Sequence, residues 1–229
     1  MHDKQHFTLY QGCFLMISFC VLLIFFPVGG ALDLALIHPW ISPSGQFLLR
    51  DNWYLAELNH RYVKDLIIAL YGSFLLLWLA SFKVQKLKAV RFSYGYFLVM
   101  VIISTSVIGL LKSQSAHACP WNSTLPSAEG FFWDFSATQG HCFPGGHAST
   151  GFALMAGFFV FRLSQPKRAY FFLIAGVILG FAMGWAQMMR GAHFLSHNLW
   201  TGWIIWFVNV IVYLFYYRKF KLNNAAVSA

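Results

Sequence analysis

Apolar residues occur along this chain in six long runs that are separated by shorter polar segments. The runs span residues 12–32, 66–82, 94–111, 148–161, 170–189 and 199–217. A helix that crosses the hydrocarbon core of a bilayer needs about 20 mostly apolar residues. The runs reach or approach that length, except 148–161, which is shorter and depends on the residues before it. The pattern predicts an all-α, polytopic membrane bundle with six transmembrane helices.

The composition supports a membrane protein and excludes most soluble classes. Hydrophobic residues make up 59% of the 229 residues and charged residues 10%, whereas soluble domains contain roughly 45–50% and about 25%. This balance excludes a disordered chain, a coiled coil, a collagen and an ordinary cytosolic enzyme. We find no internal repeat and no long linker. We therefore expect residues 1–229 to form a single membrane domain with a motif-bearing core at about 66–217, and no nucleic-acid partner.

Positive charge is distributed unevenly between the loops of this predicted bundle. Eleven of the sixteen Lys and Arg residues lie in the N-terminal segment, the loops after the second and fourth runs, and the C-terminal tail, whereas six of the seven acidic residues lie in the other loops. Cytoplasmic loops of membrane proteins are enriched in Lys and Arg. We therefore expect both termini in the cytoplasm of a bacterial inner membrane, with the loops after the first, third and fifth runs on the periplasmic or extracellular side.

The first outward loop, residues 33–65, mixes apolar and charged residues. Its apolar positions recur at loosely helical spacing, at Leu49, Trp53, Leu55, Leu58 and Tyr62. One interpretation is an amphipathic helix in the membrane interface, acting as a lid or a lipid guide. The alternative is a helix that only packs over the outer end of the bundle.

Polar residues that are unusual in a membrane protein gather in two outward loops. Residues 112–147 and 189–198 contain five of the nine histidines, which are His117, His141, His147, His193 and His197. Ionisable residues at membrane depth are candidates for a functional site. The same stretches place Lys112 and Arg190 at helix ends, so we expect an active site that faces outward.

Two of these features suit a phosphate group. Lys112 ends the third run at the depth of a lipid headgroup, although a Lys there can also simply snorkel to the surface. The sequence Pro144-Gly145-Gly146-His147 opens the fourth run. Glycines before a helix let a ligand approach the backbone, and the first N–H groups of a helix attract an anion. The alternative is a glycine-rich turn that only connects the loop to the helix.

The third feature is a group of cationic and imidazole side chains with helical spacing. Arg190, His193 and His197 are separated by three and four residues, so they share one face if a helix runs through them. A nucleophilic His beside an Arg can take up a phosphoryl group covalently. The spacing of His193 and His197 also allows a metal pair, but no acidic third ligand stands nearby in the sequence.

Taken in order, these segments resemble the three-part signature of the type 2 phosphatidic acid phosphatase superfamily, K-x6-R-P, P-S-G-H and S-R-x5-H-x3-D. The corresponding segments here read KSQSAHACP, PGGH and QMMRGAHFLSH. The resemblance implies a six-helix phosphatase that needs no metal or other cofactor. It also implies that Lys112 and the backbone N–H of Gly146 bind phosphate, that His147 protonates the leaving group, and that His193 becomes phosphorylated.

The chain departs from that signature at several positions. Cys119 stands at the Arg of the first motif, Gly145 at the Ser of the second, and Gln187 and His197 at the Arg and Asp of the third. We interpret the chain as a divergent member, because RGAHFLSHNLW keeps two imidazoles and an Arg together. Gly145 and Gln187 are then expected to contribute to the phosphate site.

Two roles need residues from outside the matching positions. Arg190 lies three residues after Gln187 and is expected to reach the same phosphate. The carboxylate that orients the nucleophile is missing from the third motif, where His197 stands. Asp134 is the candidate for this role, because it and Glu129 are the only acids in the 112–147 stretch. The sequence leaves open whether His193 or His197 attacks the phosphate.

The cysteines divide into two pairs. Cys119 and Cys142 both lie in an outward loop, where oxidation to a disulfide is favoured. They bracket the stretch that leads into Pro144–His147, and we expect them to form a disulfide. Two unpaired thiols are the alternative.

These inferences predict a membrane lipid phosphatase whose partners are membrane lipids and a lipid phosphate substrate. The aromatic-rich spans suit a long prenyl or acyl chain, so undecaprenyl pyrophosphate is preferred over phosphatidic acid, phosphatidylglycerophosphate and the phosphate of lipid A. A lipid phosphotransferase on the same scaffold is one alternative, and a non-catalytic relative or a transporter is another. A transporter is disfavoured because the polar residues cluster at one surface and not at the bilayer midplane. The sequence does not indicate an oligomeric state.

Overall fold

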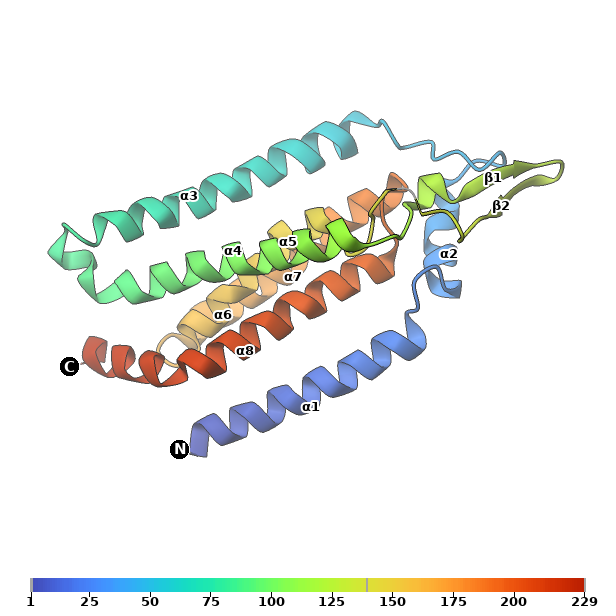
Figure 1. The fold of residues 1–229 in the computed structure, drawn as a ribbon. Helices are drawn as coiled ribbons and strands as arrows, with labels where there is room; N and C mark the ends of the chain where they lie inside the picture. Colours follow the sequence, from blue (N-terminus) through green and yellow to red (C-terminus); the bar gives the residue numbers. More distant parts are fainter. Residues whose placement is uncertain (1, 139, 229) are drawn as a thin grey trace.

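The computed structural model of the chain describes residues 2–138 and 140–228, and it is a helical bundle (Figure 1). The longer helices are α1 (His2–Phe25), α3 (Lys64–Ala80), α4 (Arg91–Gln114), α7 (Pro166–Met189) and α8 (Leu195–Ser228). Shorter elements are α2 (Ala31–Ile37), α5 (Gly146–Phe152), α6 (Ala156–Phe161) and the antiparallel strands β1 (Thr124–Ser127) and β2 (Gly130–Trp133).

Five helices in the described part of the chain are long and apolar enough to cross a membrane. They cover Asp3–Phe25, Tyr54–Ala80, Gln85–Gln114, Pro166–Met189 and Leu195–Leu222. Their outer faces carry large apolar side chains such as Phe14, Leu76 and Phe215, which are 53%, 68% and 83% exposed. Contact of this much apolar surface with water is unfavourable, whereas contact with lipid tails is not. The predicted helical membrane fold is confirmed.

The fourth predicted span is a shorter apolar helix, Gly146–Phe161, which forms the centre of the bundle. Most of its residues are buried and the others are partly buried, and it packs chiefly on α7. Gly176 and Gly180 of α7 leave room for Met155 and Phe152, since a Cβ on either glycine would lie within 3 Å of those side chains. Small residues at four-residue spacing let membrane helices approach closely, which explains how this segment fits inside the bundle.

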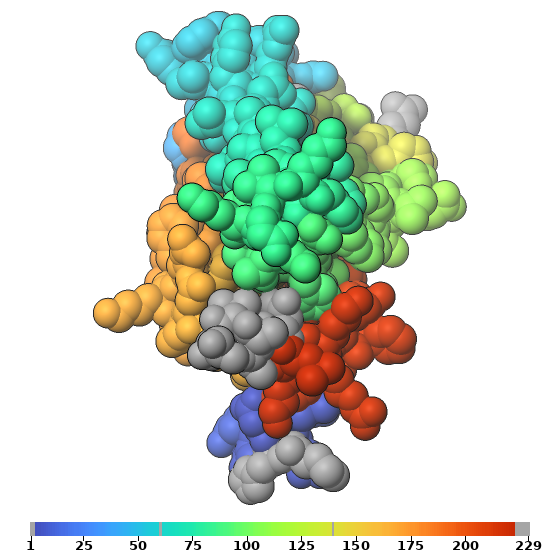
Figure 2. Space-filling model, turned by 90° about the vertical axis from the view of Figure 1, so that its left-hand side faces the viewer, coloured from blue at the N-terminus to red at the C-terminus, as the bar shows by residue number. Residues whose placement is uncertain are grey.

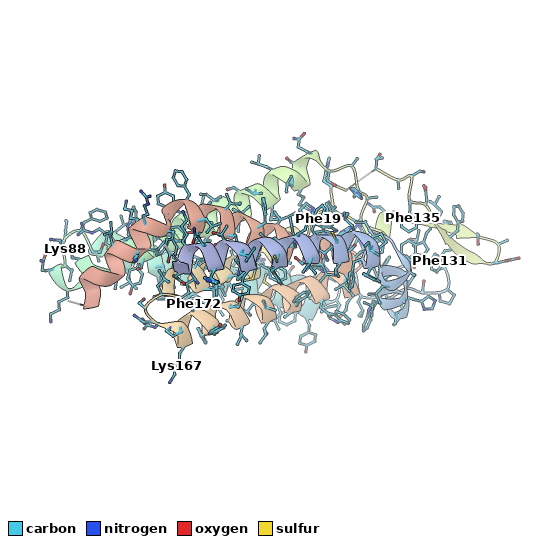
Figure 3. All side chains as sticks on the ribbon, turned by 90° about the horizontal axis from the view of Figure 1, so that it is seen from below. Phe19, Lys88, Phe131, Phe135, Lys167 and Phe172 are labelled. Carbon is cyan, nitrogen blue, oxygen red and sulfur yellow. A yellow bond between two sulfur atoms is a disulfide. The ribbon has the colours of Figure 1, made fainter. Side chains whose placement is uncertain are left out.

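Both chain ends lie at one end of the bundle, and the β1–β2 hairpin lies at the other (Figure 1). The α3–α4 turn, the start of α7 and the C-terminal part of α8 meet at the end with the termini (Figure 2). Lys88 and Lys167 project there, opposite Phe131 and Phe135 (Figure 3). The basic segments therefore gather at one end of the protein, as the positive-inside pattern requires of a cytoplasmic face.

The first loop differs from the prediction in two respects. The first helix ends at Phe25, before Pro27, because proline removes a backbone donor and restricts the residue before it; residues 31–32 belong to the separate helix α2. The amphipathic segment is not an independent interfacial helix. Residues Tyr54–Val63 form a π-helical stretch that runs directly into α3, so they lengthen the second span at its N-terminal end.

Candidate active site

Three segments meet at the hairpin end of the bundle and carry most of the predicted site residues. They are the end of α4 with Lys112, the start of α5 with Gly146 and His147, and the connection between α7 and α8 with His193. The aliphatic part of Lys112 lies over Gly146, since a Cβ on that glycine would be 3.3 Å from Lys112 Cδ. The Lys112 ammonium group is therefore held near the first N–H groups of α5.

The glycine-rich segment is fixed to the first turn of α8. The Gly145 N–H donates to the His197 carbonyl at 3.3 Å, and the Thr201 hydroxyl donates to the Gly145 carbonyl at 3.2 Å. Two helix starts, those of α5 and α8, thus lie side by side. The start of α5 is therefore held in place by the first turn of α8, next to Lys112.

The two histidines of the third motif face each other in the interior. His193 is 3% and His197 0% exposed, and their Nδ1 atoms are 3.3 Å apart. A hydrogen bond at this distance needs one imidazole to donate and the other to accept, so at least one of the two rings is neutral. His193 lies in the turn before α8 and His197 in its first turn, so the pair spans the start of the helix.

Burial keeps His193 neutral. Removal from water, together with the repulsion that positive charge on His197, Lys112 or His147 would exert, holds the pKa of the His193 imidazole well below its usual 6.5. A neutral imidazole has a free lone pair, whereas a protonated one has none. The arrangement therefore presents a nucleophile beside cationic groups that attract a phosphate.

Gln187 and Arg190 also lie at this site, where the sequence predicts them. The Arg190 guanidinium donates from Nε to the Arg50 carbonyl at 2.8 Å and from Nη1 to Gln187 Oε1 at 3.2 Å. Gln187 is 2% exposed, and its Nε2 has no hydrogen-bond partner among the described residues. A buried donor without a partner costs free energy, and a phosphate oxygen would satisfy it.

The structure does not bring Asp134 to the histidines. Its exposed carboxylate accepts hydrogen bonds from the backbone and hydroxyl of Ser136, which lower the pKa of the carboxyl below its usual value. Asp134 lies just after the end of β2, next to the turn that contains Ser136. Because the described contacts of its carboxylate are with Ser136, Asp134 is left out of the site proposed below.

Two polar residues that the sequence analysis did not single out are buried at the start of α8. Asp33, from α2, is 4% exposed and accepts hydrogen bonds from Ser196. Asn198 is 1% exposed and fills the space between Gly145 and Gly184. Asp33 is an acidic residue that follows the Pro-Val-Gly-Gly sequence at the end of the first apolar run, and this position could have identified it from the sequence. No local sequence feature identified Ser196 as its partner.

The Asn198 contact explains why glycine stands at position 145. A Cβ on Gly145 would lie 2.7 Å from Asn198 Oδ1, so the serine of the family signature would require the buried Asn198 side chain to shift. We expect Gly145→Ser to lower phosphate release at least about tenfold and to destabilise the protein by roughly 1–3 kcal/mol through overpacking. Thermal unfolding and turnover measure both effects. Combining Gly145→Ser with Asn198→Ala removes the side chain that a serine would contact, so the double variant should recover both phosphate release and stability. A double variant as impaired as Gly145→Ser alone would contradict the steric explanation.

Cys119 and Cys142 form a disulfide, which is the pairing predicted from the sequence, with Cα atoms 5.0 Å apart. The Cys142 N–H also donates to the His117 carbonyl at 2.8 Å. Cys142 lies directly before the segment that enters α5. The crosslink therefore ties the end of α4 to the approach of the glycine-rich segment.

Removing this crosslink should cost stability. In the loop-entropy description a closed loop of this length stabilises by about 3 kcal/mol. Cys119→Ser/Cys142→Ser is expected to unfold at lower temperature in detergent, and reductant should shift the wild type toward the same midpoint. Cys13→Ser/Cys20→Ser, which removes the free cysteines of the described chain, is the matched control and should change nothing. Equal midpoints for the wild type with and without reductant would contradict the prediction.

Among residues 2–138 and 140–228, no three His, Cys, Asp or Glu side chains are grouped so that they could hold a metal ion. His193 and His197 thus have no third ligand of these types in the described part of the chain.

Comparison with known proteins gives one result. The model of the PAP2 superfamily matches residues 93–221, which is more than half of the chain and includes Lys112, Gly146, His147 and His193. Neither the curated proteins nor the solved structures give a match.

Proposed function

The chain belongs to the PAP2 superfamily, whose members are generally phosphatases, and on this premise we propose that it is an integral membrane lipid phosphatase that forms a phosphohistidine on His193. The observation that carries the proposal is the buried, neutral His193 beside Lys112, His147 and His197.

The proposed reaction has two steps. The lone pair of the His193 imidazole forms a bond to phosphorus while the bond to the lipid oxygen breaks, and His147 gives that oxygen a proton. Water then attacks the phosphohistidine, passes a proton to His147 and releases inorganic phosphate, which regenerates His193. His197 takes the place of the family carboxylate, since its Nδ1 lies 3.3 Å from that of His193 and orients the ring.

The phosphate is proposed to be held by groups that the fold leaves without partners or brings to helix starts. Lys112 and the N–H of Gly146 form one side, while Gln187 Nε2 and the Arg190 guanidinium form the other. The Arg190–Gln187 hydrogen bond orients the amide so that its Nε2 remains free to donate. In this way the Gln187–Arg190 pair replaces the arginine of the signature.

We propose a lipid substrate that is cleaved at the non-cytoplasmic face of a bacterial inner membrane. The end of α4 and the start of α8, which carry Lys112 and His197, lie at the hairpin end of the bundle (Figure 1), away from the basic segments, and this supports that orientation. Undecaprenyl pyrophosphate is the preferred substrate, followed by phosphatidic acid, phosphatidylglycerophosphate and the phosphate of lipid A.

The test measures phosphate release from these lipids by the purified protein in detergent with excess EDTA. We expect release from at least one of them, undiminished by EDTA and absent in His193→Ala. Acceptor lipids added to the same assay distinguish hydrolysis from transfer of the phosphoryl group. No release from any of the lipids, or release that EDTA abolishes, would overturn the proposal.

The pH dependence follows from the lowered pKa of His193. As the pH falls below 6.5, an unfolded chain takes up a proton that buried His193 does not, so acid reduces stability. In the folded enzyme His193 stays neutral through this range, and we expect the acid limb of kcat/KM well below pH 6.5. Profiles corrected for the separately measured ionisation of the substrate phosphate check this, and an acid limb at or above pH 6.5 would contradict it.

A further inference from the structure

Asp33 lies outside the residues that match the family, yet its carboxylate reaches the start of the helix that carries His197. The carboxylate accepts hydrogen bonds from the Ser196 N–H at 2.9 Å, the Ser196 hydroxyl at 2.5 Å and the Gly29 N–H at 3.0 Å. The side chain is 4% exposed. Burial raises the pKa of this carboxyl, while the hydrogen bonds from Ser196 and Gly29 oppose that effect.

These contacts place the carboxylate at a helix N-terminus that has no cap of its own. Helix α8 begins at Leu195, directly after Phe194, and an aromatic residue at the preceding position supplies no side-chain acceptor for the first N–H groups. A carboxylate there satisfies a free donor and interacts favourably with the helix dipole. Asp33 therefore supplies from α2 the cap that a local Ser, Thr, Asp or Asn usually provides.

The first turn of α8 contains two groups whose positions matter for the proposed reaction, the imidazole and the carbonyl of His197. His197 lies next to Ser196 and pairs with His193 at 3.3 Å, and its carbonyl accepts the hydrogen bond from Gly145. Loss of the hydrogen bond from the Ser196 N–H to Asp33 would let the first turn of α8 unwind and would move His197 relative to His193. Displacement of about 1 Å at a reacting group costs roughly a hundredfold in rate.

We propose that Asp33 is a positioning residue, which caps α8 through Ser196 and thereby holds His197 against the nucleophile His193. This inference rests on the proposed function. It gives α2, which the family match does not include, a part in positioning the catalytic residues.

The first measurement concerns the cap itself and needs no activity. Hydrogen–deuterium exchange of the 194–202 segment is compared in the wild type, Asp33→Ala, Asp33→Asn and Glu129→Gln, an exposed acid in the hairpin turn. Exchange should quicken in Asp33→Ala, remain slow in Glu129→Gln, and stay near wild type in Asp33→Asn, because an amide oxygen still accepts the Ser196 N–H. Unchanged exchange in Asp33→Ala would overturn the cap.

The second measurement separates positioning from a general loss of structure through a double-mutant cycle. Asp33→Ala should lower kcat at least about tenfold with KM changed less than about threefold, and Asp33→Asn should recover most of the loss. In a His197→Ala background, Asp33→Ala should cost less than about twofold, because the residue that it positions is gone. Rates are normalised to the folded fraction measured by size-exclusion chromatography.

The outcomes distinguish the two proposals. The positioning role would be overturned if the losses of kcat in Asp33→Ala and His197→Ala multiplied in the double variant, or if Asp33→Ala kept full activity. Either result would leave the proposal of a His193-dependent phosphatase intact. A wild type without activity on any of the lipids would overturn the proposed function and the positioning role with it, and the exchange measurement would still report whether Asp33 caps α8.

Discussion

Replacing His193 with alanine is expected to lower phosphate release by at least about 10³-fold, because the variant has no group to form the covalent intermediate. Lys112, Gly146 and Gln187 would remain, so the variant should still bind the lipid with nearly unchanged affinity. The fold should survive, although loss of the imidazole leaves His197 Nδ1 without its partner at 3.3 Å. Initial rates and equilibrium binding, measured on the same preparation, separate the two effects.

The control for this experiment is His38→Ala, which removes an exposed imidazole from the first outward loop. It should retain wild-type turnover. Residual turnover in His193→Ala within about tenfold of the wild type would show that another residue attacks the phosphate. His197→Ala tests the obvious candidate and is expected to lower the rate less than His193→Ala does, because His197 only orients the nucleophile.

Replacing His147 with asparagine should have the second largest effect, and the size of the effect should depend on the leaving group. A general acid contributes roughly 10²–10⁴-fold when the departing oxygen is a poor leaving group. The diacylglycerol alkoxide that departs from a monoester such as phosphatidic acid needs that proton, whereas an aryl oxide leaves without it. We therefore expect the loss to fall within this range on a lipid phosphate and to shrink below about tenfold on an aryl phosphate.

The comparison between the two substrates is the informative part of the His147 experiment. Lys112→Met is the matched variant, since Lys112 is proposed to bind the phosphate and not the leaving group. Its loss should be similar on both substrates. Equal losses for His147→Asn on the two substrates would contradict the acid role and leave His147 as a phosphate ligand.

Much of this architecture could be predicted from the sequence because it depends on local pattern. Long apolar runs specify membrane helices, and the short run at 148–161 proves to be a buried central helix. Lys112, His147 and His193 lie at helix ends that the same pattern locates. The Cys119–Cys142 pairing followed from two cysteines in one outward loop.

What the sequence did not reveal depends on contacts between distant segments. Asp33 and Ser196 are separated by 163 residues, and no local feature of either identifies the other. Asp134 looked suitable because acids are scarce in its loop, but its carboxylate accepts hydrogen bonds from Ser136 in the turn after β2. The glycine at position 145 looked like a departure from the signature until Asn198 was found in the space that a serine would need.

The amphipathic segment in the first loop shows a further limit of pattern. Its apolar positions are compatible with an interfacial helix and with the outward extension of a membrane span. The structure joins Tyr54–Val63 to α3 without a break, since no proline or glycine separates the two. Periodicity identifies a helix here, but it does not identify which neighbour the helix continues into.

The central claim is that His193 carries the phosphoryl group, and a single-turnover experiment tests it most directly. Excess enzyme is mixed with a lipid labelled in its phosphate, quenched with alkali after short times, and digested for mass spectrometry of the segment that contains both His193 and His197. We predict a transient, acid-labile phosphoryl group on His193 that forms and decays at rates consistent with turnover. A phosphoryl group on His197, or complete release of phosphate with no phosphorylated peptide at any time, would contradict the claim.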